Sequence, residues 1–149
     1  MREIKIKKYA IIFTFYIVLQ LIETMLWWWC ADVNDLGMLA IGLPVLVIYP
    51  LIALISGGVS YGKTCSLFVP TLLFLIAIFI NLVIILYLIK ANISERHYIR
   101  CAEETFVYVY ELGKIALIAN FVGALSAKII LFIKSKNKTE DSSMTSKNN

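Results

Sequence analysis

Four long apolar runs constrain the fold of this 149-residue chain more than any other feature of its sequence. Each run has roughly 20 residues or more, and a helix of that length crosses the ~30 Å hydrocarbon core of a bilayer. Hydrophobic residues make up 60% of the chain and charged residues 16%, whereas soluble domains have roughly 45–50% and about 25%. We therefore predict an all-α membrane protein, a single bundle of four transmembrane helices joined by short loops.

The predicted four-span transmembrane domain comprises residues 1–133, and its expected spans cover residues 9–29, 36–55, 67–89 and 107–133. The fourth span could start at Val107 or at Ile115, and the earlier start requires a tilted helix. The polar segment after it, residues 134–149, cannot bury a core. We therefore predict that this segment is a disordered cytoplasmic tail.

The basic N-terminus, followed by an apolar run, is also typical of a secretory signal peptide. The apolar part here has about 20 residues, which is longer than the roughly 7–15 of a signal peptide. It ends in Trp27, Trp28 and Trp29 rather than in small residues. Because tryptophan is enriched where a span meets the membrane surface, we expect a retained first span.

The distribution of lysine and arginine predicts the orientation of the spans. With the N-terminus inside, three basic residues lie in the outer loops, Lys90, Arg96 and Arg100. Nine lie in the inner segments: Arg2, Lys5, Lys7, Lys8, Lys63, Lys134, Lys136, Lys138 and Lys147. Because cytoplasmic loops carry the excess of positive charge, we expect both termini in the cytoplasm. The composition, rich in lysine, asparagine and isoleucine, is typical of an AT-rich genome, so the expected location is a bacterial plasma membrane.

Glu23 is the one acidic residue that sits deep in an apolar run. With Tyr16, Gln20 and Trp27 it forms a series spaced by 4, 3 and 4 positions. Residues three or four apart lie above one another on a helix, so the series occupies one narrow face. A charge in hydrocarbon is costly, and this face should therefore point toward protein or water rather than lipid.

Two asparagines add to this polar face. Asn81 in the third predicted span falls at a depth similar to that of Glu23, and Asn120 lies near the middle of the fourth. Our candidate intramembrane polar site is therefore Glu23, Gln20, Asn81 and Asn120. Two interpretations of Glu23 stay open: a protonated carboxyl in a structural interhelical hydrogen bond worth about 1 kcal/mol, or a carboxylate that exchanges protons or binds cations.

Small residues recur on one face of the fourth span and predict a helix-packing surface. They are Ala116, Ala119, Gly123 and Ala127. Lys114 lies on the opposite side of that helix. We expect its side chain to extend to the outer membrane surface, helped by Glu111 one turn earlier, rather than to act as the counter-ion of Glu23.

The segment from Gly57 to Thr64, GGVSYGKT, matches the P-loop pattern G-x-x-x-x-G-K-[ST]. A P-loop follows a buried strand and cradles phosphates at a helix N-terminus. Here membrane spans flank the segment, and no room remains for a parallel sheet. We therefore expect no nucleotide binding, and we interpret residues 56–66 as a glycine-rich cytoplasmic turn.

No arrangement of residues in the sequence indicates catalysis by paired carboxylates, by a metal cluster or by a nucleophile with its base. Cys30, Cys65 and Cys101 are too scattered for a zinc site or a disulfide framework, although Cys30 and Cys101 could pair on the outer side. The net charge of +4 comes from lysines that flank spans, which argues against nucleic-acid binding. We expect no metal, no cofactor and no enzymatic activity.

The expected function is that of a small non-enzymatic multi-pass membrane protein. It would act through helix–helix contacts as an accessory, regulatory or immunity-type subunit of a membrane complex. Its partners would be the lipid bilayer and another membrane protein, or a second copy of itself. The alternative is a small homo-oligomeric transporter coupled to protons or cations through Glu23.

Overall fold

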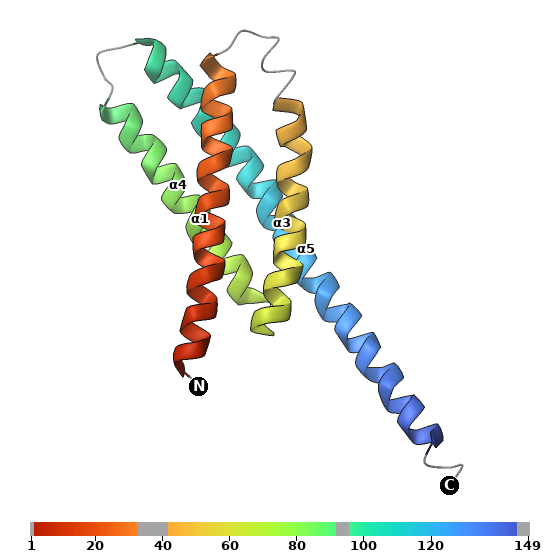
Figure 1. The fold of residues 1–149 in the computed structure, drawn as a ribbon. Coiled ribbons are helices and arrows are strands. Elements are labelled where there is room, and N and C mark those ends of the chain that lie inside the picture. Colours follow the sequence, from red (N-terminus) through yellow and green to blue (C-terminus); the bar gives the residue numbers. More distant parts are fainter. Residues whose placement is uncertain (1, 33–41, 92–95, 146–149) are drawn as a thin grey trace.

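In the computed structural model the described residues are 2–32, 42–91 and 96–145, and they are largely helical (Figure 1). The helices are α1 (Arg2–Asp32), α3 (Leu43–Thr64), α4 (Phe68–Ala91) and α5 (Arg96–Thr145). Within these ranges, four helices are long and apolar enough to cross a membrane, over Ile6–Trp29, Pro44–Thr64, Phe68–Leu88 and Glu103–Lys136. The prediction of an all-α chain with four helices of membrane-crossing length is confirmed.

The bundle is assembled around α5, which contacts each of the other three helices. Its pairing with α3 is the most extensive helix contact, whereas the contacts of α3 with α1 and with α4 are the least extensive. The N-terminus of α1 and the C-terminal end of α5 lie at the same end of the bundle in Figure 1. Four consecutive helices that alternate in direction produce this arrangement.

The second span differs from its prediction. α3 covers Leu43–Thr64, whereas the sequence predicted a span over residues 36–55 and a turn over 56–66; residues 36–41 lie outside the described part of the chain. Pro44 lies in the first turn of α3, where a missing N–H costs no hydrogen bond. The helix ends at Thr64 and is capped by Cys65, which adopts the left-handed conformation (φ 54°) and donates its N–H to the Tyr61 carbonyl oxygen at 2.7 Å.

Two of the three glycines expected to form a turn, Gly57 and Gly58, instead pack closely against α5. A Cβ atom at Gly57 would lie 2.0 Å from the carbonyl oxygen of Asn120, and one at Gly123 would lie 1.8 Å from the carbonyl oxygen of Leu54. Only glycine lets the two backbones approach this closely. The contact with α5 therefore explains why the helix continues through a segment that looks like a turn in isolation.

α5 is longer than the predicted fourth span at both ends. It begins at Arg96, ahead of both expected starts, and Arg100 forms an ion pair of 2.8 Å with Glu104 in its first turns. At the other end α5 continues to Thr145, through most of the segment predicted to be disordered. The costly step of helix formation is nucleation, so a helix that already exists elongates readily into a polar segment.

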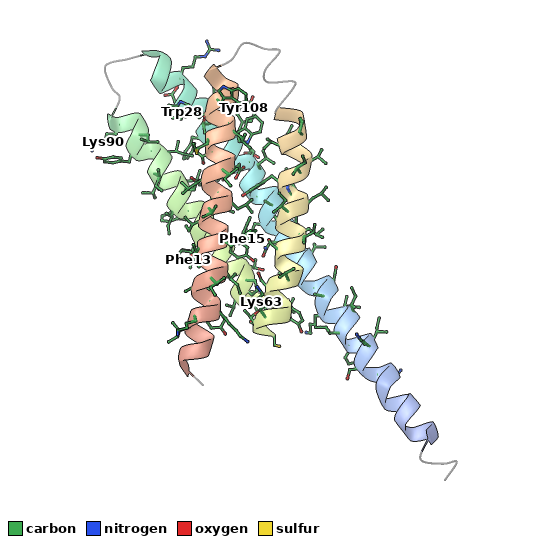
Figure 2. The ribbon with its side chains drawn as sticks, in the orientation of Figure 1. Phe13, Phe15, Trp28, Lys63, Lys90 and Tyr108 are labelled. Atoms are coloured by element: carbon green, nitrogen blue, oxygen red, sulfur yellow. The ribbon has the colours of Figure 1, made fainter. Side chains whose placement is uncertain are left out.

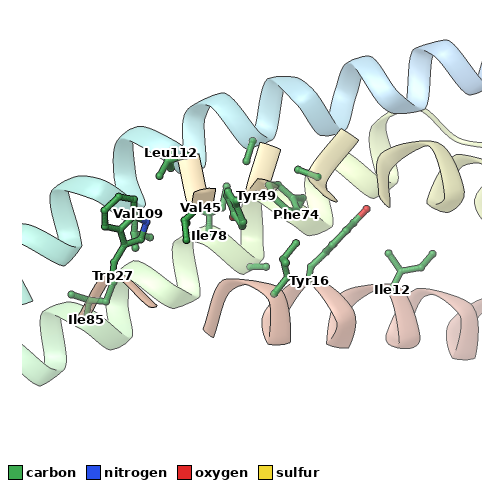
Figure 3. Packing of buried hydrophobic residues seen from close by; sticks show 14 residues of the cluster. Ile12, Tyr16, Trp27, Val45, Tyr49, Phe74, Ile78, Ile85, Val109 and Leu112 are labelled. Atoms are coloured by element: carbon green, nitrogen blue, oxygen red, sulfur yellow. The ribbon is translucent and has the colours of Figure 1, made fainter. Parts of the chain in front are cut away.

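Aromatic contacts connect α1 to α4 and α5 at two levels, and Figure 3 labels Tyr16, Phe74 and Trp27, which take part in them. Tyr16 meets Phe74 of α4 edge to face, with ring centroids 5.0 Å apart. Trp27 stacks on Tyr108 of α5, with ring centroids 4.3 Å apart and ring planes 5° apart. Large apolar side chains also cover the outside of all four helices, as expected for a surface that faces lipid tails.

We predict that Gly123→Ala lowers the free energy of unfolding by roughly 2 kcal/mol or more, because the new methyl group would overlap the Leu54 carbonyl. The measurement is the unfolding transition in detergent micelles. Gly62→Ala is the matched control, since no atom lies within 4 Å of its added Cβ. Equal stability of the Gly123→Ala protein and the wild type would rule out this close contact.

Candidate functional site

The polar face predicted for α1 points into the bundle. Tyr16, Gln20, Glu23 and Trp27 are all buried. Ile22, next to Glu23 in the chain, is 50% exposed and lies on the outer side of the same helix. The Glu23 side chain therefore lies inside the bundle rather than on its outer surface, where a polar group would be left without partners.

Asn120 of α5 organises the first group of buried hydrogen bonds. Its side-chain nitrogen lies 3.2 Å from the Tyr16 hydroxyl, 3.1 Å from the Ala53 carbonyl oxygen and 3.3 Å from the Ser56 hydroxyl. The Tyr16 hydroxyl in turn donates to the Ser60 hydroxyl at 3.0 Å. We call these polar side chains (Tyr16, Ser56, Ser60 and Asn120) the Asn120 cluster, and they join α1, α3 and α5.

Gln20 of α1 organises the second group, one turn further along that helix. Its amide donates to the Tyr49 hydroxyl of α3. Asn81 of α4 donates to the Gln20 carbonyl oxygen at 3.2 Å and accepts a hydrogen bond from the Thr24 hydroxyl at 2.9 Å. We call these residues (Gln20, Thr24, Tyr49 and Asn81) the Gln20 cluster, and they join α1, α3 and α4.

The structure therefore distributes the four predicted site residues over three places. Gln20 and Asn81 lie together, Asn120 belongs to the other cluster, and Glu23 has no hydrogen bond to either. Three polar residues of α3 that lie in the interior, Tyr49, Ser56 and Ser60, were not predicted. No sequence signal indicates that these side chains point inward, because their orientation depends on the register of α3.

Glu23 is 1% exposed, and neither of its carboxyl oxygens has a hydrogen-bond partner among the described residues. The Tyr49 hydroxyl lies beside this carboxyl group and interacts with it electrostatically. Two other buried atoms, Trp27 Nε1 and Asn120 Oδ1, also lack a partner, but neither residue lines a cavity described below. Lys114 pairs with Glu111 at 2.7 Å on the exposed side of α5 rather than with Glu23.

Two cavities lie one after the other between α1 and α3, and both open outward. The first has a volume of about 270 Å³ and is lined by residues that include Glu23, Ile22 and Tyr49. The second has a volume of about 330 Å³ and reaches Phe15 and Lys63, which Figure 2 labels. Ile52 lines both cavities. We call this strip, with its two cavities, the α1–α3 seam.

The small-residue face of α5 lies partly in the interior. Ala116 and Gly123 are buried, and Ala119 and Ala127 are half-buried. Gly123 meets the α3 backbone at Leu54, and the Ala127 methyl group lies 3.8 Å from the position of a Cβ added at Gly58. These contacts occupy the small-residue face within the chain itself.

The segment that matches the P-loop pattern is helical from Gly57 to Thr64. A P-loop binds phosphate with the free N–H groups of a loop that precedes a helix, and the N–H groups of this segment lie inside a continuous helix. The described residues contain no group of three or more potential metal ligands. The side chains of Cys30 and Cys101, predicted as a possible disulfide, are outside the described ones.

Comparisons with protein-family models, with curated proteins and with solved structures found no match. The function of the site must therefore be inferred from its geometry.

We predict that Asn120→Ala lowers the free energy of unfolding by about 2 kcal/mol, because the side chain hydrogen-bonds to both α1 and α3 and interhelical hydrogen bonds contribute roughly 0.6–1.7 kcal/mol each. Titration with a denaturing detergent measures the change. Ser126→Ala is the control, since the Ser126 hydroxyl is exposed and bonds to its own helix at Val122. Similar losses in both variants would mean that the Asn120 cluster does not hold the bundle together.

Proposed function

We propose that this chain is a non-enzymatic multi-pass membrane protein that acts through helix contacts inside the bilayer. It serves as an accessory, regulatory or immunity-type subunit of a membrane complex in a bacterial plasma membrane, with both termini in the cytoplasm. Its partner docks on the α1–α3 seam. No nucleotide or nucleic acid takes part.

The observation that supports this proposal is the incomplete contact between α1 and α3. The two helices are held together by hydrogen bonds at two levels, Tyr16 to Ser60 and Gln20 to Tyr49, while cavities open outward beside both. Membrane helices associate through close packing and interhelical hydrogen bonds. An open apolar seam therefore favours a further helix as its occupant.

A second candidate function is favoured by Glu23 itself. A buried carboxyl group beside an outward-opening cavity is the arrangement required of a residue that picks up and releases a proton or a cation. A small homo-oligomeric transporter coupled through Glu23 would use this group.

We predict that Ile22→Trp disrupts the native complex, because an indole at this position would fill the mouth of the cavity beside Glu23. The complex size is measured on native gels after solubilising membranes in mild detergent. Leu86→Trp is the matched control, since Leu86 of α4 has the same 50% exposure as Ile22 but does not line the seam. If wild type and both variants all migrate as monomers, the docking proposal is refuted.

The transporter hypothesis makes a separate prediction for Glu23→Gln. Gln retains the shape of the side chain but cannot carry a proton or a charge, so coupled flux in proteoliposomes would disappear while thermal stability in detergent is retained. Under our leading proposal the wild type and the Glu23→Gln protein both fail to dissipate an imposed pH gradient. A flux that is present in the wild type and lost in a folded variant would favour the transporter.

A further inference from the structure

We propose that the second cavity of the α1–α3 seam binds an anionic phospholipid. An acyl chain of the lipid fills the apolar groove, and the phosphate lies against the Lys63 ammonium group, at the membrane surface nearer the N-terminus. This inference goes beyond the proposed docking function and does not depend on it, because docking is tested at the first cavity through Ile22.

The walls of the second cavity fit a hydrocarbon chain. The cavity has a volume of about 330 Å³ and opens outward, and its lining includes Ile11 and Phe15 of α1 and Ile55 and Val59 of α3. These four side chains are between 48% and 64% exposed, so they present apolar surface to the groove. An empty groove would leave their atoms without contacts on one side. In a bilayer the chain of a lipid supplies those contacts.

Lys63 supplies a positive charge at one end of this cavity. It is the one charged residue among the described residues that line the cavity, and it lies in the last turn of α3. Figure 2 labels it nearer than Phe15 to the end of the bundle that holds the N-terminus. The Lys63 side chain is exposed and has no ion pair with another described residue. Its ammonium group is therefore available to a phosphate, which forms strong charge-assisted hydrogen bonds with lysine.

Lys8 of α1 adds a second positive charge near the same end. It is exposed and precedes Ile11 by three residues, so it lies on the face of α1 that borders the cavity. The hydrogen bond between Tyr16 and Ser60 provides a common level for the two helices. From Ser60, Lys63 lies about 4.5 Å further toward the N-terminal side of the bundle. From Tyr16, Lys8 lies about 12 Å further in the same direction. A phosphate between these levels can be approached by a lysine side chain from each helix.

The charge at this end favours an anionic lipid over the other occupants of an apolar groove. The described residues that line the cavity include no acidic side chain, so the amine of a zwitterionic headgroup would meet only like charge. A docked helix would need an acidic residue at this depth to pair with Lys63. An anionic phospholipid supplies an apolar chain and a negative charge in one molecule, and basic pockets between membrane helices bind such headgroups.

Native mass spectrometry of the delipidated protein, titrated with lipids of identical acyl chains, tests the site. We expect the wild type to bind phosphatidylglycerol about fivefold or more tightly than phosphatidylcholine, since one lysine near a membrane surface contributes about this factor. Lys63→Met should remove the preference and Lys63→Arg should retain it. Lys134→Met is the matched control, because Lys134 is an exposed lysine of α5 that does not line the seam.

The shape of the groove is tested while Lys63 remains in place. Val59→Trp would fill the groove with an indole and should lower the binding of phosphatidylglycerol to the level of the Lys63→Met protein. Val83→Trp is the control, since Val83 of α4 is similarly exposed but lies outside the seam. Melting transitions in detergent check that each variant folds, and the Lys63→Met variant is expected to fold because Lys63 is exposed.

Equal binding of the two lipids by the wild type, or a preference that survives Lys63→Met, overturns the inference. Unchanged binding in a folded Val59→Trp protein also overturns it. Inorganic phosphate should not raise the melting temperature relative to chloride at the same ionic strength. Stabilisation by phosphate equal to that by phosphatidylglycerol would assign the site to a soluble anion instead. None of these results bears on the Ile22→Trp test, so the two proposals can be judged separately.

Discussion

The backbone contact between α3 and α5 is the interaction on which the rest of the structure depends. Lipid tails are as apolar as the side chains of a span, so helices in a membrane gain little from hydrophobic burial and need close packing and hydrogen bonds. Gly57 and Gly123 provide the close packing. A Cβ atom added to either glycine would overlap a backbone carbonyl oxygen of the other helix. The same contact turns Ser56 and the Ala53 carbonyl toward Asn120.

Because α3 packs mainly against α5, interactions other than close packing with α3 must hold α1 in the bundle. Hydrogen bonds from Gln20 and Tyr16 and the stacking of Trp27 hold it at separate levels. Between these points the contact with α3 is incomplete, and the α1–α3 seam is the result. The polar residues of α1 and the open α1–α3 seam therefore lie along the same helix. This combination is why we place the functional surface there.

The sequence was sufficient for features that depend on local periodicity. Spans of about 20 apolar residues predict membrane helices wherever they occur, and the spacing of Tyr16, Gln20 and Glu23 predicts one face whatever surrounds it. The register of α3 could not be predicted, because glycines near residue 57 favour a turn in an isolated segment. In the folded chain these glycines lie in a helix that packs against the backbone of α5. The partners of Asn120 on α3 depended on that register, so the grouping of the polar residues could not be predicted either.

α5 is a single helix of 50 residues that passes through the bundle and continues well beyond it (Figure 1). From Asn120, where it is bonded to α1 and α3, to its end at Thr145 it extends about 37 Å at 1.5 Å per residue. A rigid rod of this length acts as a lever: a change of about 10° in its tilt moves the far end by roughly 6 Å. A small rearrangement among membrane helices would thus become a large displacement on the side of the N-terminus, where a water-soluble protein could detect it.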